Sequence, residues 1–197
     1  MNRHRAVHQA TALLLSYPDP VWAERLPQVA AALTQLKGSD VELLLGFCGE
    51  AASAPLLDLA SRYVITFDRS RRRTLHLSHY TDGDTRRRGA SLAALKSRYR
   101  AHGWEPDDGE LPDFLPVVLE FAARCPQAGI PVLHHYRGAV DLLARALADY
   151  RSPYADVLRA LQHTLPAAGP QPAPVPNEAT PVPFPIRATP GDEGVRR

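Results

Sequence analysis

The sequence predicts an all-α protein: a single compact helical bundle over residues 1–165, followed by a proline-rich tail over residues 166–197. Apolar residues up to about residue 165 mostly recur at three- and four-residue steps, and no stretch alternates long enough to suggest a half-buried strand. Hydrophobic residues make up 45% of the chain, which is enough for a core. Nine of the 19 prolines then fall in the last 32 residues, without any period, so we expect this tail to be disordered or polyproline-like.

Four helices are expected in the first part of the chain. Each has apolar residues on one face, and the first, second and fourth end at a proline, a glycine and a basic run respectively. Pro18 and Pro20 end the first helix, and Gly38 ends the second. The expected ranges are 4–16, 21–37, 40–51 and 55–67.

Four more helices are expected after an aperiodic stretch over residues 74–80, which fits either an extended segment or a short helical turn. Thr85 is predicted to cap a long helix, and Asp113 to cap the next one. Residues 125–126 break that helix, and Pro131 is expected to begin another. The expected ranges are 85–102, 113–124, 131–147 and 153–165.

Charge is unevenly distributed along the chain. The net charge is only +2, but residues 62–100 hold 11 Lys/Arg against three Asp/Glu. A basic block in an otherwise acidic chain suggests a partner of complementary charge, such as an acidic protein face, a phosphate-bearing ligand or nucleic acid. A nucleic-acid-binding helical protein that uses the region of Arg69–Arg88 therefore stays open as an alternative.

The sequence offers little support for membrane insertion, secretion or catalysis. No apolar run is long enough to span a membrane, and the apolar stretch after the basic N-terminus is too short for a signal peptide, so we expect a cytoplasmic chain. Phosphate-loop, dinucleotide-binding, zinc-protease and nucleophile-elbow motifs are absent, so no enzyme activity and no catalytic residue are predicted.

The histidines and cysteines could hold a metal only if distant residues converged. His76 and His79 are three positions apart, and His134 and His135 are adjacent, with Cys125 nearby. Adjacent helical residues point about 100° apart, so only one of the last pair could face a given site. We therefore expect no metal and no cofactor, and we predict that Cys48 and Cys125 are buried thiols.

The segment 110–116 (ELPDFLP) is the strongest candidate for binding a partner. It could be only a well-capped helix start. Together with the basic block, it could instead form a groove whose apolar floor takes an amphipathic helix and whose charged rim orients that helix.

Several short motifs in order resemble one known family. They are Thr66-Phe67-Asp68, Leu75-His76-Leu77, Tyr80, Gly83-Asp84-Thr85-Arg86, Arg88-Gly89, Leu95-Lys96, Tyr99, residues 110–116 and Leu119-Glu120-Phe121. On these motifs the chain resembles the NarJ-type nitrate reductase molybdenum cofactor assembly chaperones. These are a branch of the redox-enzyme maturation proteins, whose TorD-like and DmsD-like members serve other reductases. The resemblance covers roughly residues 7–165.

The resemblance implies a cytoplasmic all-helical chaperone rather than an enzyme. It would bind the N-terminal segment of the apo catalytic (alpha) subunit of respiratory nitrate reductase, and would assist molybdenum cofactor insertion and assembly before membrane docking. It would bind no nucleic acid, would not insert into the membrane and would not belong to the final enzyme complex.

The resemblance also implies roles for individual residues. Apolar surface for the partner would come from Phe67, Leu77, Tyr80, Phe114 and Leu115. Asp84, Arg86, Glu110 and Asp113 would position the partner or hold the groove, and Gly83, Gly89 and Pro112 would serve structural turns or close helix approaches. Relatives hold histidine where this chain has Phe114, so no role of that histidine is carried over.

Overall fold

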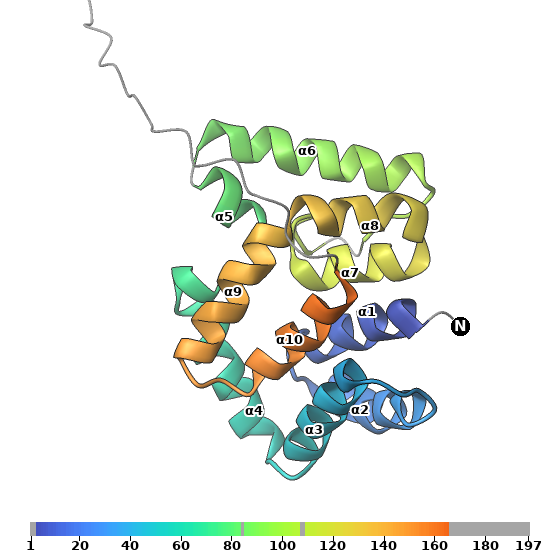
Figure 1. Cartoon of the computed structure of the whole chain (residues 1–197). Helices are drawn as coiled ribbons and strands as arrows, with labels where there is room; N and C mark the ends of the chain where they lie inside the picture. The colour runs from blue at the N-terminus through green and yellow to red at the C-terminus, as the bar shows by residue number, and fades with distance from the viewer. Residues whose placement is uncertain (1–2, 84, 107–108, 166–197) are drawn as a thin grey trace, which may run out of the picture.

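The computed structural model describes residues 3–83, 85–106 and 109–165, and these residues form helices joined by short loops (Figure 1). The helices are α1 (Arg3–Leu14), α2 (Pro20–Leu33), α3 (Ser39–Ala52), α4 (Leu56–Tyr63), α5 (Ser78–Asp82), α6 (Arg86–Ala101), α7 (Leu115–Arg124), α8 (Pro126–His135), α9 (Arg137–Asp149) and α10 (Tyr154–Thr164). A π-helical turn, Val64–Asp68, extends α4, and a 3₁₀ turn, Arg71–Arg73, follows it. No β-strand occurs in the described ranges, so the predicted all-α class is confirmed.

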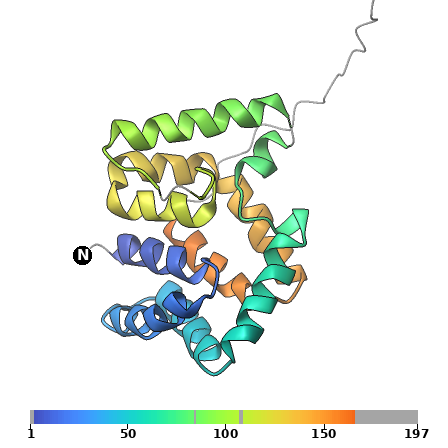
Figure 2. The ribbon, with the colours of Figure 1, turned by 180° about the vertical axis from the view of Figure 1, so that it is seen from behind.

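Helix α7 lies at the centre of the bundle, where it packs between α1 and α8 (Figures 1 and 2). Eight of its ten residues are buried, and Leu115, Val118, Leu119, Phe121 and Ala122 are fully buried. Burial of each large apolar side chain contributes about 1.5–3 kcal/mol, so this helix anchors the core.

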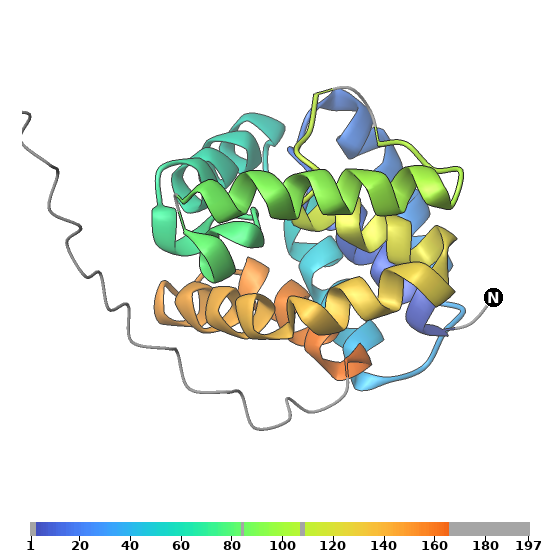
Figure 3. The same ribbon diagram turned by 90° about the horizontal axis from the view of Figure 1, so that it is seen from above.

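The outer elements surround this centre. Helix α10 packs against α3, α9 and α1, while α6 lies across the top of the molecule, as the view from above shows (Figure 3). Only Leu95 and Tyr99 of α6 are buried, so most of this basic helix faces solvent. None of the helices in the described part of the chain is long and apolar enough to cross a membrane.

The first loop shows how local sequence fixes the fold. Asp19 caps α2, because its carboxylate accepts a hydrogen bond from the backbone N–H of Trp22 at 2.6 Å, and Pro20 occupies the first helical position. The indole N–H of Trp22 then donates to the carbonyl of Leu13 at 2.7 Å. This bond holds α2 against the end of α1.

Two predicted helix starts are wrong. Pro131 does not begin a helix but lies inside α8, which begins at Pro126, and the chain bends at Tyr136 before α9. Asp113 does not cap α7, because the cap position belongs to Phe114. In both cases tertiary contacts outweigh the local signal: α8 is held against α7, and Asp113 is turned into the core.

The aperiodic stretch 74–80 combines the two forms that its sequence left open. His76 forms an isolated antiparallel bridge, and α5 begins two residues later. Cys48 is buried as predicted, but Cys125 is only half-buried, because it occupies the bend between α7 and α8. The predicted disorder of residues 166–197 lies outside the described residues.

Candidate functional site

The motifs of the basic block and of segment 110–116 meet through a short backbone bridge. His76 lies opposite Phe114 in antiparallel fashion. The N–H of Leu77 donates to the carbonyl of Asp113 at 3.0 Å, and the N–H of Leu115 donates to the carbonyl of Leu75 at 2.8 Å. The bridge brings together two motifs that are almost 40 residues apart in the sequence.

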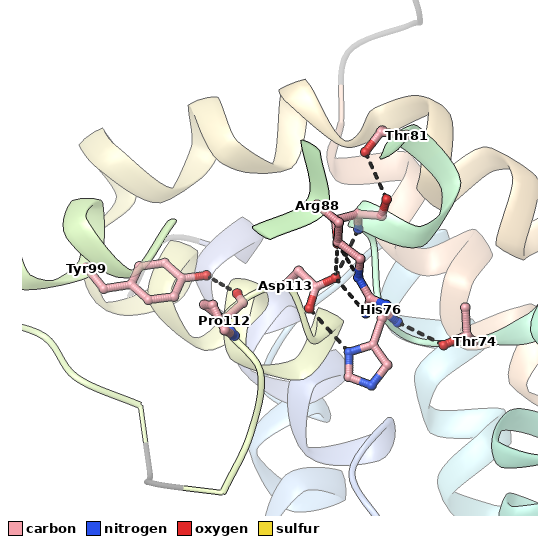
Figure 4. A network of polar contacts seen from close by, with 8 residues as sticks. Thr74, His76, Thr81, Arg88, Tyr99, Pro112 and Asp113 are labelled. Carbon is pink, nitrogen blue, oxygen red and sulfur yellow. Dashed lines mark hydrogen bonds and ion pairs between the residues drawn. The ribbon is translucent and has the colours of Figure 1, made fainter. Parts of the chain in front are cut away.

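A polar network forms around Asp113, which is fully buried beside the bridge (Figure 4). One carboxylate oxygen accepts hydrogen bonds from the hydroxyl and the backbone N–H of Ser78. The other oxygen lies 3.3 Å from Nδ1 of His76, and an ionised carboxylate can only accept, so His76 carries its proton on Nδ1. The network therefore joins α5 to the segment that leads into α7.

Arg88 brings a cation to the same network from the first turn of α6. Its Nε donates to the Ser78 hydroxyl at 3.1 Å, and its Nη2 lies 3.8 Å from the Asp113 carboxylate. Burial alone would raise the pKa of Asp113, but the hydrogen bonds and charge of His76, together with the hydrogen bonds of Ser78, outweigh it. The pKa of Asp113 is therefore held below its ordinary value, and the carboxylate stays ionised at neutral pH.

Two tyrosines that are not part of this network hold the neighbouring backbone through their hydroxyl groups. The hydroxyl of Tyr99 donates to the carbonyl of Pro112 at 2.6 Å, which fixes the turn before Asp113. The hydroxyl of Tyr80 lies within hydrogen-bond distance of the carbonyls of Arg72 and Thr74. Both contacts hold backbone segments in place, so they shape the site.

A groove of about 970 Å³ runs beside this network between α1, α2 and the start of α7. Aromatic rings of Tyr17, Tyr63, Trp104 and Phe114 contribute to its walls, and Ala6, Ala10 and Leu13 of α1 are among its apolar residues. A second pocket of about 360 Å³ shares Tyr63, Asp68, His76 and Phe114 with it. The two hollows form one continuous candidate binding surface, which we call the groove.

Charges line the groove unevenly. Acidic side chains come from Asp68, Glu105, Glu110 and Glu120, whereas the cations of the larger hollow are Arg25 and Arg124. Glu105 pairs with Arg100 and Glu120 pairs with Arg124, but in the described ranges no cation pairs with Asp68 or Glu110. The rim of the larger hollow is therefore negatively charged and favours a cationic ligand, whereas the smaller hollow also has Arg71 and Arg88 in its lining.

Of the residues proposed from the family resemblance, Tyr80 and Asp113 line neither hollow and have the contacts described above, and the other seven separate into three groups. Glu110 and Phe114 line the larger hollow and Phe67 lines the smaller one. Leu77 and Leu115 are fully buried, so in this structure they pack the core and present no surface to a partner. Arg86 is exposed at the start of α6 and lines neither hollow, and Asp84 lies outside the described residues.

The three residues proposed for turns behave differently from one another. Gly83 ends α5 with φ of +59°, a conformation that glycine adopts at little cost. Gly89 is exposed in α6, and a Cβ placed there would meet nothing, so it serves no close approach. Pro112 is half-buried and contributes its carbonyl to Tyr99.

Much of the groove comes from residues that no sequence motif marks. We predicted that arginines of the basic block would form the charged rim of the groove. Of those arginines, only Arg71 and Arg88 line a hollow, and it is the smaller one. Arg88 also contacts Ser78 and Asp113. The groove residues of α1 and α2 belong to ordinary apolar helix faces, and nothing in their sequence indicates that they line a groove. Among the described residues no group of three or more His, Cys, Asp or Glu could hold a metal ion.

Comparison with known proteins identifies the family. The family model described as nitrate reductase delta subunit matches residues 23–160, which is more than half of the chain. The chain belongs to the nitrate reductase delta subunit family. The resemblance to NarJ-type chaperones is thereby confirmed.

Named relatives agree with this membership. The nitrate reductase molybdenum cofactor assembly chaperone NarJ of Escherichia coli K12 is 32% identical over 158 residues, which cover 77% of this chain and 67% of that protein. A Bacillus subtilis protein named as the same kind of chaperone is 36% identical over 154 residues, covering 77% of this chain and 84% of that one.

A longer relative and a solved structure complete the comparison. The nitrate reductase-like protein NarX of Mycobacterium tuberculosis H37Rv is 40% identical over 159 residues, and the chain spans about a quarter of its length, 24%. A crystal structure from Archaeoglobus fulgidus, described as a redox enzyme maturation protein, aligns with a TM-score of 0.64 at 20% identity, covering 83% of this chain and 94% of that one. This likeness confirms the family fold.

Proposed function

We propose that this chain is a chaperone dedicated to nitrate reductase, which binds the N-terminal segment of the apo alpha subunit in the groove. The observation that carries the proposal is a half-open groove with aromatic walls and two carboxylates, Asp68 and Glu110, that lack a cationic partner in the described residues. An amphipathic helix with basic residues fits such a surface, because its apolar face covers the rings while its cations approach the carboxylates.

The proposed role is assembly rather than chemistry. By holding the segment, the chain would keep the alpha subunit competent for insertion of the molybdenum cofactor and would delay membrane docking until insertion is complete. The names of the NarJ relatives support this role. We place the chain in the cytoplasm, as neither an enzyme nor a component of the final complex.

Release of the client needs no nucleotide in this scheme. The alpha subunit has two states, an apo state that exposes its N-terminal segment and a loaded state that withdraws it. A chaperone that binds only the exposed segment shifts this equilibrium toward the apo state. Cofactor binding shifts it toward the loaded state, which withdraws the segment and releases the chaperone. The groove supplies affinity through apolar contact, and the acidic rim supplies selectivity and the rate of association.

The experiment that tests the proposal is calorimetric titration of the full chain with a synthetic peptide of the alpha subunit's N-terminal segment. We expect saturable binding that Phe114→Ala weakens, because this half-buried ring borders both hollows. Unchanged affinity in a folded Phe114→Ala variant would move the site away from the groove. Absence of binding by the folded wild-type chain would overturn the proposal.

The alternative of nucleic-acid binding has weaker support in the structure. Arg73 donates to the carbonyl of Thr66 at 2.9 Å and stacks 3.8 Å from the ring centroid of Tyr150, and Arg88 is turned toward Asp113. Part of the basic block therefore has internal roles. Steeply salt-dependent binding to generic duplex DNA would favour this alternative.

A further inference from the structure

The groove has features that suit a second kind of ligand, an extended proline-rich segment. Tyr17 is 49% exposed although it packs edge-to-face on Tyr63, with ring centroids 5.5 Å apart, and Trp104 and Phe114 are half-buried in the same walls. Grooves lined by exposed aromatic rings recognise polyproline II segments, because the ligand is already extended and loses little entropy on binding.

Two carboxylates give this aromatic surface a preference for a cation. Asp68 and Glu110 both line the larger hollow, together with Tyr63. Burial is the main cause that raises the pKa of the Tyr63 hydroxyl, and the negative charges of Asp68 and Glu110 raise this pKa further. In the described part of the chain neither carboxylate forms an ion pair. A proline-rich segment with an arginine would therefore satisfy both the rings and the charges.

The chain itself contains such a segment. Residues 181–187 read Pro-Val-Pro-Phe-Pro-Ile-Arg, and Phe184 is the only aromatic residue after Tyr154. Arg187 is the first cation beyond residue 165. Alternating prolines favour the polyproline II conformation.

The bundle ends close enough to the groove for this segment to reach it. At the end of α10 the hydroxyl of Thr164 lies 2.9 Å from Nε2 of His8, and the carbonyl of Leu165 accepts from Arg137 at 3.1 Å. His8 belongs to α1, whose next residues, Gln9 and Ala10, line the groove. Helix α1 therefore lies between the last described residues and the groove, and a helix with its side chains is roughly 10–12 Å across.

The intervening residues 166–180 supply ample length. At about 3.1 Å per residue in polyproline II form they would reach roughly 45 Å. Even as a flexible coil their root-mean-square span would be roughly 20 Å, which exceeds that separation and keeps the effective concentration near the millimolar range.

We propose that residues 181–187 of this chain dock in the groove between α1, α2 and α7, with Phe184 against its aromatic wall and Arg187 beside Asp68 and Glu110. The tail then competes with any client for the same surface. This competition rests on the proposed function, whereas the docking itself does not.

Photo-crosslinking of the full chain tests the docking without a client. p-Benzoylphenylalanine replaces Phe184, and after irradiation the monomer band is digested and mapped by mass spectrometry. We expect crosslinks within one chain to residues of α1, of α2, or of the ranges 104–106 and 109–116. The same photo-residue at Leu57, which is 80% exposed and lines neither hollow, should give no crosslink to those elements. Crosslinks between two chains, crosslinks elsewhere on the bundle, or none at all would overturn the proposal.

Charge exchange tests the assignment of Arg187. Arg187→Glu should lower the ratio of docked to undocked chain about fivefold, the size expected for one partly exposed ion pair. Combining it with Glu110→Arg should restore much of the crosslink yield, and Arg197→Glu, outside the segment, should leave the yield unchanged. Equal losses from Arg187→Glu and Arg197→Glu, or no rescue by the exchanged pair, would overturn the assignment.

Client titration then separates the two proposals. If both hold, Phe184→Ser with Arg187→Glu tightens binding of the alpha-subunit peptide to the full chain, because the competitor is weakened. Crosslinks in a chain that binds no peptide would overturn the proposed function and leave tail docking standing. Unchanged peptide affinity in the double variant would overturn the competition.

Discussion

Ser78 donates to the carboxylate of Asp113 twice, through its hydroxyl and through its backbone N–H at 3.1 Å. The two residues are 35 positions apart, and one begins α5 while the other precedes α7. This pair therefore fixes the segment that carries Phe114 and Glu110 relative to the basic block.

Loss of the Asp113 carboxylate should destabilise the whole bundle. We expect Asp113→Ala to lower the free energy of unfolding by about 2–4 kcal/mol, because the buried hydroxyl and N–H of Ser78 would lose their acceptor and the half-buried His76 and Arg88 would lose a charged partner. Urea unfolding followed by circular dichroism measures this. A loss below 0.5 kcal/mol, about the size of an ordinary surface substitution, would show that water replaces the carboxylate.

The same carboxylate should make the free energy of unfolding decrease as the pH falls. Its pKa in the folded state is below its ordinary value, so the unfolded chain takes up the proton first as the pH falls. The stabilisation is complete above the unfolded pKa of about 4 and is lost as the pH falls through the lower folded pKa. We expect the melting temperature of Asp113→Asn to fall less steeply below pH 4 than that of the wild type. Parallel curves would contradict the assignment.

His8 should produce a separate pH dependence at a higher pH. Burial, followed by the charges of His4 and His134, lowers the pKa of His8 to about 4. The hydroxyl of Thr164 donates to the carbonyl of Leu161, so its oxygen accepts from the Nε2–H of a neutral His8. The unfolded chain binds a proton near pH 6.5 and the folded chain does not, so stability should fall by up to about 3 kcal/mol from pH 6.5 to 4.

Substitution of His8 isolates this effect in thermal melts over that pH window. His8→Gln should be less stable than the wild type at pH 7 but should lose less stability between pH 6.5 and 4. His135→Gln, at an exposed position, should keep the wild-type curve. If His8→Gln retained the full dependence, another group would be responsible.

Two glycines in helices should respond oppositely to alanine. A Cβ at Gly129 of α8 would overlap the backbone of Ala122 in α7, so Gly129→Ala should cost about 1–3 kcal/mol. Gly89 of α6 has open space around it, so Gly89→Ala should stabilise by about 0.5–1 kcal/mol. Chemical denaturation of both variants gives the comparison. A neutral Gly129→Ala would mean that α7 and α8 can move apart.

Reversal of one rim charge should weaken client binding while leaving the fold intact. Glu110→Lys places a cation where the groove favours one from the ligand, so we expect lower affinity for the alpha-subunit peptide and a slower association rate. Glu42→Lys, on the exposed side of α3, is the matched control and should bind as the wild type. Equal affinities in calorimetry would remove Glu110 from the binding surface.

Helix positions in this protein follow from local rules. Periodic apolar residues and the stops at Pro18 and Pro20 place most helices to within a few residues, because these signals act over one or two turns, although α2 ends at Leu33 before the expected stop at Gly38. Pro131 is an exception: it lies inside α8 instead of beginning a helix, because the packing of α8 on α7 stabilises the helix on both sides of this proline. The ordered motifs around residues 66–121 also identified the family, since they are a property of the sequence itself.

The sequence by itself thus determined the all-α class, most helix limits and the family. Only the tertiary structure decided that Asp113 is a buried acceptor, that Leu77 and Leu115 pack the core, and that the groove is built from α1 and α2 as well as segment 110–116. The physical reason is distance along the chain. Helix formation depends on neighbours within about four residues, whereas a groove depends on which faces of distant helices are left uncovered once the core has packed.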